Sequence, residues 1–255
     1  MSSLEKTTQL AIELLKKQKI TDYEVSLGKS SGVSTKVRLS EVETLQYHLD
    51  TSFNVNVYIG KKKGHASSAD LGKESLIRAI ESSCLIAKYT QEDPFNGLAP
   101  KERLAWQVPE LDLYHFWDLD AKKSIDIAKE CEEVALQQPE IDNSDGAEIS
   151  SFEGESIYAN SNGLVARAKN TKHSLYCSLI AKREREMQTA YEYSVALDAG
   201  ELFPAKQVGM EAARLAQQKL GSQNLRPQKC PILFTPRQST GLFSQLLGAL
   251  SGSRQ

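Results

Sequence analysis

The stretch Asn54–Ile59 (NVNVYI) decides the fold, because polar and apolar residues alternate along it. Alternation of period two is typical of a strand with one buried face. Gly60–Gly64 (GKKKG) follows directly and predicts a hairpin turn into a further strand. Similar short alternating runs lie upstream, at residues 23–27, 34–39 and 43–47. We therefore expect an antiparallel meander of short strands in this part of the chain.

Helical patterns lie on both sides of this meander. Residues 4–19 carry apolar side chains at helical spacing, and the run ends at Asp22. Residues 71–89 return to helical spacing, with a predicted sheet-facing side made of Leu76, Ile77, Ile80, Cys84, Ala87 and Lys88. The first unit is thus predicted to be helix, antiparallel meander, helix.

The same order then repeats after a break. Asp93–Pro100 contains two prolines and a glycine, which continue neither a helix nor a central strand. Asn162–Gly163 is a strong hairpin signal in the second meander. The elements expected here are helices at 121–137 and 203–220 and strands at 146–152, 156–159, 164–169, 173–182 and 187–196. The predicted fold class is α+β, with two successive helix, antiparallel meander, helix units.

The C-terminal residues predict the start of a third, mainly β domain that is truncated. Cys230–Thr235 is expected to form a short buried strand, and Pro236 to begin a helix. That helix has a broad apolar face, which predicts burial against further structure. The expected division is 1–100 for an N-terminal α+β domain, 101–118 for a linker, 119–228 for a central α+β domain and 229–255 for the truncated domain.

Composition indicates a folded protein of the cytoplasm. The net charge is −2, with 40% hydrophobic and 25% charged residues, so nothing attracts the chain to nucleic acid or to anionic lipid. The N-terminus lacks the features of a signal peptide, and no apolar run approaches the roughly 20 residues that span a bilayer. The four cysteines are widely separated, which predicts reduced, mostly buried thiols at Cys84, Cys131, Cys177 and Cys230.

No catalytic or cofactor-binding residue can be assigned from these patterns. None of the four histidines is paired with another at helical spacing, and no glycine-rich nucleotide loop is present. His173 and Cys177 share one face of an expected strand, but about 13 Å would separate them along it. That distance excludes a Cys-His nucleophile between the two.

Several longer segments resemble the PmbA/TldE branch of the TldD/PmbA family of peptide-maturation proteins (peptidase U62, "modulator of DNA gyrase"). The resemblance extends over nearly the whole chain, and its two longest segments are specific. The residues that carry it are Val57–Leu71, Ile86–Ala99, Tyr158–Gly163, Lys206–Ala213, Gly241–Phe243 and Gly248–Gly252.

The resemblance implies a subunit of a cytosolic hetero-oligomer that processes small or unfolded peptides. Its TldD-like partner would carry zinc on an H-E-x-x-x-H helix. In this chain Ser244 and Ala249 stand at the two histidine positions and Gln245 stands at the glutamate position. None of these side chains binds zinc strongly, and an amide is not a general base at neutral pH. We therefore expect no metal site here and zinc in the partner subunit.

Two alternatives stay open. One is a nonproteolytic binding or regulatory protein, such as a topoisomerase modulator. The other is a nonfunctional truncated remnant, for which the uncovered apolar face of the last helix predicts aggregation.

Overall fold

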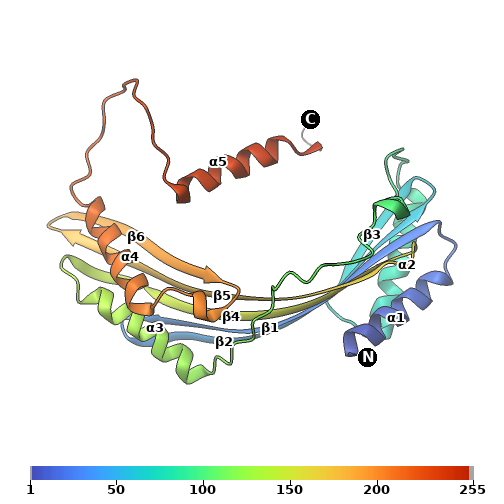
Figure 1. The fold of residues 1–255 in the computed structure, drawn as a ribbon, viewed down its shortest axis with the longest axis horizontal. Coiled ribbons are helices and arrows are strands. Elements are labelled where there is room, and N and C mark those ends of the chain that lie inside the picture. Colours follow the sequence, from blue (N-terminus) through green and yellow to red (C-terminus); the bar gives the residue numbers. More distant parts are fainter. Residues whose placement is uncertain (1, 253–255) are drawn as a thin grey trace. The chain divides into compact units, whose positions relative to one another are not determined.

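The computed structural model describes residues 2–252 and confirms the α+β class. In chain order, the first helix–meander–helix unit is α1 (Ser3–Lys16), β1 (Asp22–Arg38), β2 (Glu41–Ile59), β3 (Lys62–Ser68) and α2 (Lys73–Tyr89). The second is α3 (Ala121–Leu136), β4 (Ile141–Asn160), β5 (Val165–Arg183), β6 (Glu186–Ala196) and α4 (Ala205–Lys219). Short 3-10 turns lie at Lys101–Arg103 and Ala199–Glu201, and the last helix is α5 (Pro236–Ala249). The predicted order of helices and meanders is therefore correct (Figure 1).

The two meanders join in one antiparallel sheet. Its strand order is β3-β2-β1-β4-β5-β6, because β1 pairs with β4 along most of its length. The contact between the meanders is thus made by the first strand of each. The chain divides into two compact units after Gly221, so the sheet and its four helices belong to one unit and α5 belongs to the other.

The strands are longer than the sequence predicts. The runs 23–27 and 34–39 are parts of one 17-residue strand, β1, and the other short runs merge in the same way into β2, β4 and β5. Gly28–Gly32 interrupts the apolar alternation, yet its backbone pairs with β2 on one side and β4 on the other. Main-chain hydrogen bonds continue a strand where burial does not. Side-chain pattern alone therefore underestimated strand length.

All four helices of this unit cover the same face of the sheet. Val25 and Leu27 of β1 pack in the cluster below α1 and α2. Val33, on the same face of β1, packs in the cluster below α3 and α4. Thr35 also faces α3, where its hydroxyl lies 2.7 Å from that of Ser124. The helix pairs thus cover the two ends of the long strands and leave the middle of this face to other residues (Figure 1).

One predicted helix contact is wrong. Lys88 is exposed on α2, whereas the smaller Ala79 and Ser83 are buried against the sheet. Close packing explains the difference, because the α2 backbone at Ser83 and Ala87 lies directly over Gly64 of β3. A helix this near to a strand buries small side chains and leaves the long ones outside.

The second unit contains α5 but lacks the strand predicted at Cys230–Thr235. No other segment of residues 222–252 pairs with this stretch, and a strand needs a neighbour for its backbone groups. Cys230 is exposed, which corrects its predicted burial, whereas Cys131 and Cys177 are buried and Cys84 is partly buried. The apolar face of α5 is exposed within the described residues. Among them, no helix has the length and apolarity to span a membrane.

Candidate functional site

The middle of the helix-covered face is crossed by residues 113–119, which we call the strap. The strap begins at the edge of β5, where the Thr171 amide donates a 2.9 Å hydrogen bond to the Leu113 carbonyl. The Thr171 hydroxyl accepts from the His115 amide at 3.0 Å and donates to the Leu197 carbonyl at 2.7 Å. One threonine therefore joins the strap to the sheet and to the segment that follows β6.

A buried histidine holds the next part of the strap. His173 is fully buried, and its Nε2 lies 3.0 Å from the His115 carbonyl oxygen. A carbonyl only accepts, so Nε2 carries the proton and Nδ1 is free to accept. Nδ1 lies 2.9 Å from the Ser151 hydroxyl, which is then the donor. Trp117 stacks edge-on against the same ring, with 5.4 Å between ring centroids. The His173 ring thus contacts both the backbone and a side chain of the strap.

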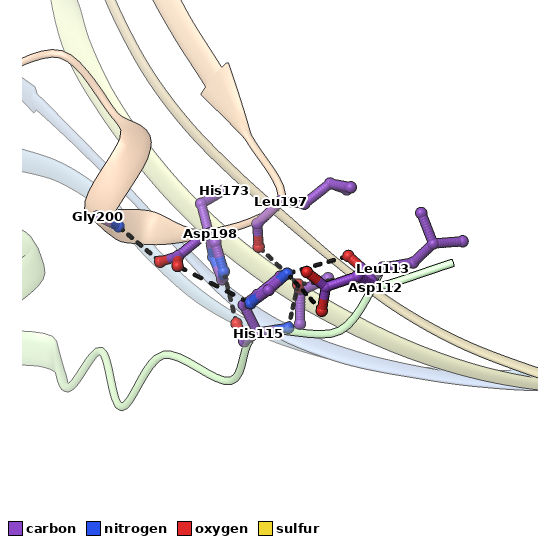
Figure 2. Close-up of polar contacts among 8 residues, drawn as sticks. Asp112, Leu113, His115, His173, Leu197, Asp198 and Gly200 are labelled. Atoms are coloured by element: carbon purple, nitrogen blue, oxygen red, sulfur yellow. Dashed lines mark hydrogen bonds and ion pairs between the residues drawn. The ribbon is translucent and has the colours of Figure 1, made fainter. Parts of the chain in front are cut away.

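Two carboxylates flank the imidazole of His115. Nε2 lies 3.0 Å from the backbone carbonyl oxygen of Asp112 and 3.5 Å from its carboxylate. Nδ1 lies 3.8 Å from the carboxylate of Asp198 (Figure 2). The other oxygen of Asp198 accepts from the Gly200 amide at 2.8 Å, which fixes the carboxylate in the turn after β6. The arrangement ties the segment 112–115 to the turn after β6 on one side of the sheet.

A cavity of about 260 Å³ lies between the strap and the sheet. Its lining combines apolar and aromatic side chains with a few polar atoms, which is the usual composition of a small-ligand site. It reaches from the His173 side of the strap to strand β2. The residues that define it best are Val33, Tyr47, Phe116, Trp117, Ser151 and His173.

Glu153 closes the cavity on its polar side. One carboxylate oxygen accepts from Ser31 at 3.0 Å, and the other accepts from the Tyr114 phenol at 2.7 Å. The hydrogen bond to Glu153 raises the pKa of Tyr114, because it favours the protonated phenol. These contacts position the strap, and within residues 2–252 the ring of His173 hydrogen-bonds to a hydroxyl and a backbone carbonyl instead of a carboxylate.

The Ser151–His173 pair is better suited to structure than to nucleophilic catalysis. In a catalytic triad the base is oriented by a carboxylate, which also stabilises the imidazolium. Here the His115 backbone carbonyl occupies the position of that carboxylate, and this neutral group supplies no negative charge to stabilise a protonated His173 ring. The other nearby nucleophile type is also inert: Cys131 and Cys177 are buried in contact, and their hydrogen bond together with burial raises the pKa of the Cys131 thiol.

The three residues that the resemblance places at the zinc-motif positions lie on α5. Ser244, Gln245 and Ala249 are all exposed there, and the Ser244 hydroxyl donates to the Thr240 carbonyl at 2.9 Å. A hydroxyl, an amide and a methyl group do not form a zinc ligand set, so these residues do not fit the metal. Among residues 2–252, no group of three or more His, Cys, Asp and Glu side chains lies close enough together to hold a metal ion.

Models of two domains of one protein family match most of the first compact unit, residues 1–221. "PmbA/TldA metallopeptidase domain 1" matches residues 23–87, and "PmbA/TldA metallopeptidase central domain" matches residues 114–220. The chain belongs to the PmbA/TldD metallopeptidase family. The strap lies almost entirely within the second match, and the first strands of both meanders are included.

Curated members of this family are similar over almost the whole chain. The metalloprotease PmbA homolog of Haemophilus influenzae is 35% identical over 250 residues, which cover 98% of this chain and 55% of the relative. The metalloprotease PmbA of Escherichia coli O157:H7 is 34% identical over the same length and coverage. The chain therefore spans about half the length of the curated relatives it matches.

Solved structures show the same fold. A Bacteroides thetaiotaomicron protein, described as a candidate modulator of DNA gyrase, matches with a TM-score of 0.90 and 26% identity, over 99% of this chain and 58% of its own. TldE from Thermococcus kodakarensis matches with a TM-score of 0.62 and 15% identity, over 85% of this chain and 47% of its own. At 15% identity the second match supports the fold alone.

Sequence reasoning missed the strap and the cavity. Residues 101–118 were predicted as a linker. The strap overlaps the end of this segment, and it holds the sheet face through contacts with residues far along the chain. A signal was present, because Tyr114, Phe116 and Trp117 are close together in a segment without helical or strand periodicity. Aromatic residues concentrated in a loop often pack against a distant surface.

Proposed function

We propose that this PmbA/TldD-family chain acts as the noncatalytic, TldE-like subunit of a metalloprotease complex. In this proposal a TldD-like partner supplies zinc and the general base, and this chain helps to hold small or unfolded peptides for cleavage. The complex would work in the cytoplasm, in the proteolysis and maturation of such peptides. The observation that carries the proposal is family membership combined with Ser244, Gln245 and Ala249 in place of the metal-binding residues.

The fold supports a role in peptide holding. The sheet has two edge strands, β3 and β6, and both are shorter than the strands beside them. Parts of β2 and β5 therefore have free backbone groups at the edges of the sheet. An extended peptide can add to such an edge through main-chain hydrogen bonds, which accept varied side chains.

The test mixes the chain with a purified TldD-like protein. We expect peptide cleavage by the mixture, zinc bound in the partner, and neither cleavage nor stoichiometric zinc in this chain alone. The variant Gln245→Ala should leave cleavage by the mixture unchanged, because in this proposal no proton transfer passes through residue 245. Peptide hydrolysis or one equivalent of zinc in the isolated chain would contradict the division of roles.

A second candidate function is regulation of a topoisomerase without proteolysis. The Bacteroides structure described as a candidate modulator of DNA gyrase favours it, since that protein is 26% identical over 99% of this chain. Three results together would support this function over the first. The immobilised chain would recover gyrase from cell extract, the purified chain would change the rate of supercoiling by gyrase, and its mixture with a TldD-like partner would cleave no peptide.

A further inference from the structure

Part of strand β2 is an open edge of the sheet. β3 pairs with β2 only from Phe53 to Ile59, so within residues 2–252 the segment 41–52 has a paired strand on one side alone, although the Thr51 hydroxyl donates to the Ala69 carbonyl. Four exposed apolar residues lie in this segment: Val42, Leu45, Tyr47 and Leu49. Tyr47 and Leu49 are 70% and 69% exposed, which is unusual for apolar strand residues. We call residues 41–52 the free edge.

The hydrogen-bonding direction of the free edge follows from the neighbouring strands. The Tyr23 amide and carbonyl of β1 both bond to Ser161, on the β4 side. Odd-numbered residues of β1 therefore face β4, and even-numbered residues bond to β2. Val33 is the partner of Tyr47 across the β1–β2 pair, so the backbone groups of Tyr47 point away from β1. The same holds for Leu45 and Leu49, whose outward amides and carbonyls have no partner among the described residues.

The equivalent position in the other meander is occupied by the chain itself. Tyr47 and Thr171 each lie twelve residues before the last residue of their strand, β2 and β5. The outward amide of Thr171 donates to Leu113 at the start of the strap. An extended segment therefore already pairs with the sheet at one of two equivalent positions. The backbone at Tyr47 presents the same groups, for which the described part of the first compact unit supplies no partner.

The cavity below the strap lies beside this free position. Tyr47 and His48 belong to its lining, together with Phe116 and Trp117 of the strap. The side chain of Tyr47 projects from the helix-covered face, as does that of Val33 opposite. A chain that pairs with Tyr47 would place alternate side chains on that face. The cavity measures about 260 Å³, and an engineered cavity of about 150 Å³ suffices to bind benzene.

We propose that the free edge of β2 binds an extended peptide as an added strand, with one apolar or aromatic side chain of the peptide in the cavity beside Tyr47 and Trp117. The proposal rests on the proposed function in peptide handling and names the place where this chain holds the peptide. Main-chain pairing at Leu45, Tyr47 and Leu49 supplies affinity without a fixed sequence, and the cavity adds a preference for an apolar residue.

The first experiment uses the unmodified chain and a labelled, end-capped octapeptide that alternates threonine with phenylalanine. Two versions of the peptide carry N-methyl groups on alternate amides, one on the odd set and one on the even set. Only one set can face β2, so we expect one version to bind at least about tenfold more weakly, given the loss of several hydrogen bonds, while the other binds like the parent. Equal binding of the two methylated versions, or no binding of the parent peptide, would overturn the proposal.

The second experiment changes the protein. Tyr47→Pro removes an outward amide without removing a bond to β1, and edge positions tolerate proline. The matched control Tyr47→Ala loses the same ring but keeps the amide. We expect peptide binding to weaken about tenfold further in Tyr47→Pro than in Tyr47→Ala, and hydrogen exchange at Leu45 and Leu49 to slow on peptide addition to the unmodified chain. Equal binding by the two variants would contradict edge pairing.

Other outcomes separate this inference from the proposed function. If the edge variants and methylated peptides have no effect while the mixture with a TldD-like partner cleaves peptides, the function stands and the edge site is wrong. If the edge binds peptide but the mixture cleaves nothing, the site stands and the function is wrong. A further outcome concerns the protein without peptide. If amide exchange at the free edge slows as the protein concentration rises, the edge pairs with a second copy of this chain and the proposal is overturned.

Discussion

The two meanders have the same order of elements but differ in how each completes its outer strand. In the second half (residues 121–219), the strap pairs with Thr171 and covers the adjacent face through His173. In the first half (residues 3–89), no described segment pairs with β2 at Tyr47, and the side chain there is exposed. Within the described residues, the same architecture is therefore closed by its own chain at one position and open at the equivalent one. An open edge retained beside a cavity is more consistent with binding than with stability.

The largest expected effects test whether both halves depend on close backbone contact. Gly64 of β3 lies under α2, and a Cβ added there would meet the Ser83 carbonyl and, at 2.6 Å, the Ala87 nitrogen. A Cβ added at Gly209 of α4 would meet the Cys131 carbonyl of α3. Gly64→Ala and Gly209→Ala should each lower the free energy of unfolding by about 3 kcal/mol, the upper range for overpacking. Urea denaturation measures this, with Gly241→Ala as control because its Cβ meets nothing within 4 Å. A change below about 1 kcal/mol in either half would show that its helix shifts away from the contacted strand or helix at little cost.

A smaller effect is expected where the first half depends on the second. Glu132 of α3 is fully buried, and its carboxylate accepts from the Leu39 and Ser40 amides at 2.9 and 2.8 Å. Both of these residues have positive φ, 51° and 62°, in the turn between β1 and β2. Glu132→Ala should cost about 2 kcal/mol, because two partly buried amides lose a charged acceptor.

The control for that change is Glu133→Ala on the exposed side of the same helix. Thermal unfolding followed by circular dichroism should separate the two variants clearly. Equal midpoints would mean that solvent replaces the carboxylate at the turn, and that the first half does not need the second for its hairpin.

The strap gives a more local prediction. His173→Leu leaves the His115 carbonyl and the Ser151 hydroxyl without their partner, which should cost about 1–2 kcal/mol. The loss should appear first in the strap, as faster proteolysis and faster amide exchange at residues 113–119, while α1 and α2 stay protected. His65→Leu, at an exposed histidine of β3, is the matched control. Unchanged exchange in the strap would show that its other contacts, at Thr171 and Glu153, hold it without His173.

The smallest expected effect concerns pH. Burial, and then a 2.8 Å hydrogen bond to Glu24, raises the pKa of Tyr58 above its ordinary value of about 10. The folded state therefore favours the protonated phenol, so this contribution is complete below about pH 10 and is lost as pH rises through the raised pKa. In Tyr58→Phe, stability should be about 1 kcal/mol lower at neutral pH, and the decline above pH 10 should be shallower.

Phenolate absorbance during titration checks the assignment, since the late-titrating fraction should decrease in Tyr58→Phe. Tyr47→Phe, at the exposed tyrosine of the free edge, provides the comparison. Loss of an early-titrating group in Tyr58→Phe would contradict the raised pKa of Tyr58.

The α+β class, the order of the elements and the family follow from local properties of the chain, namely its periodicity and specific segments such as Val57–Leu71. The same local reading places Ser244, Gln245 and Ala249 on one C-terminal helix, and the chemistry of these side chains does not suit zinc. The pairing of β1 with β4, the hold of His173 on the strap and, within residues 2–252, the unpaired backbone of β2 at Tyr47 emerge from tertiary contacts. These features depend on hydrogen bonds between residues far apart in the chain, and such bonds leave no periodic trace in the sequence.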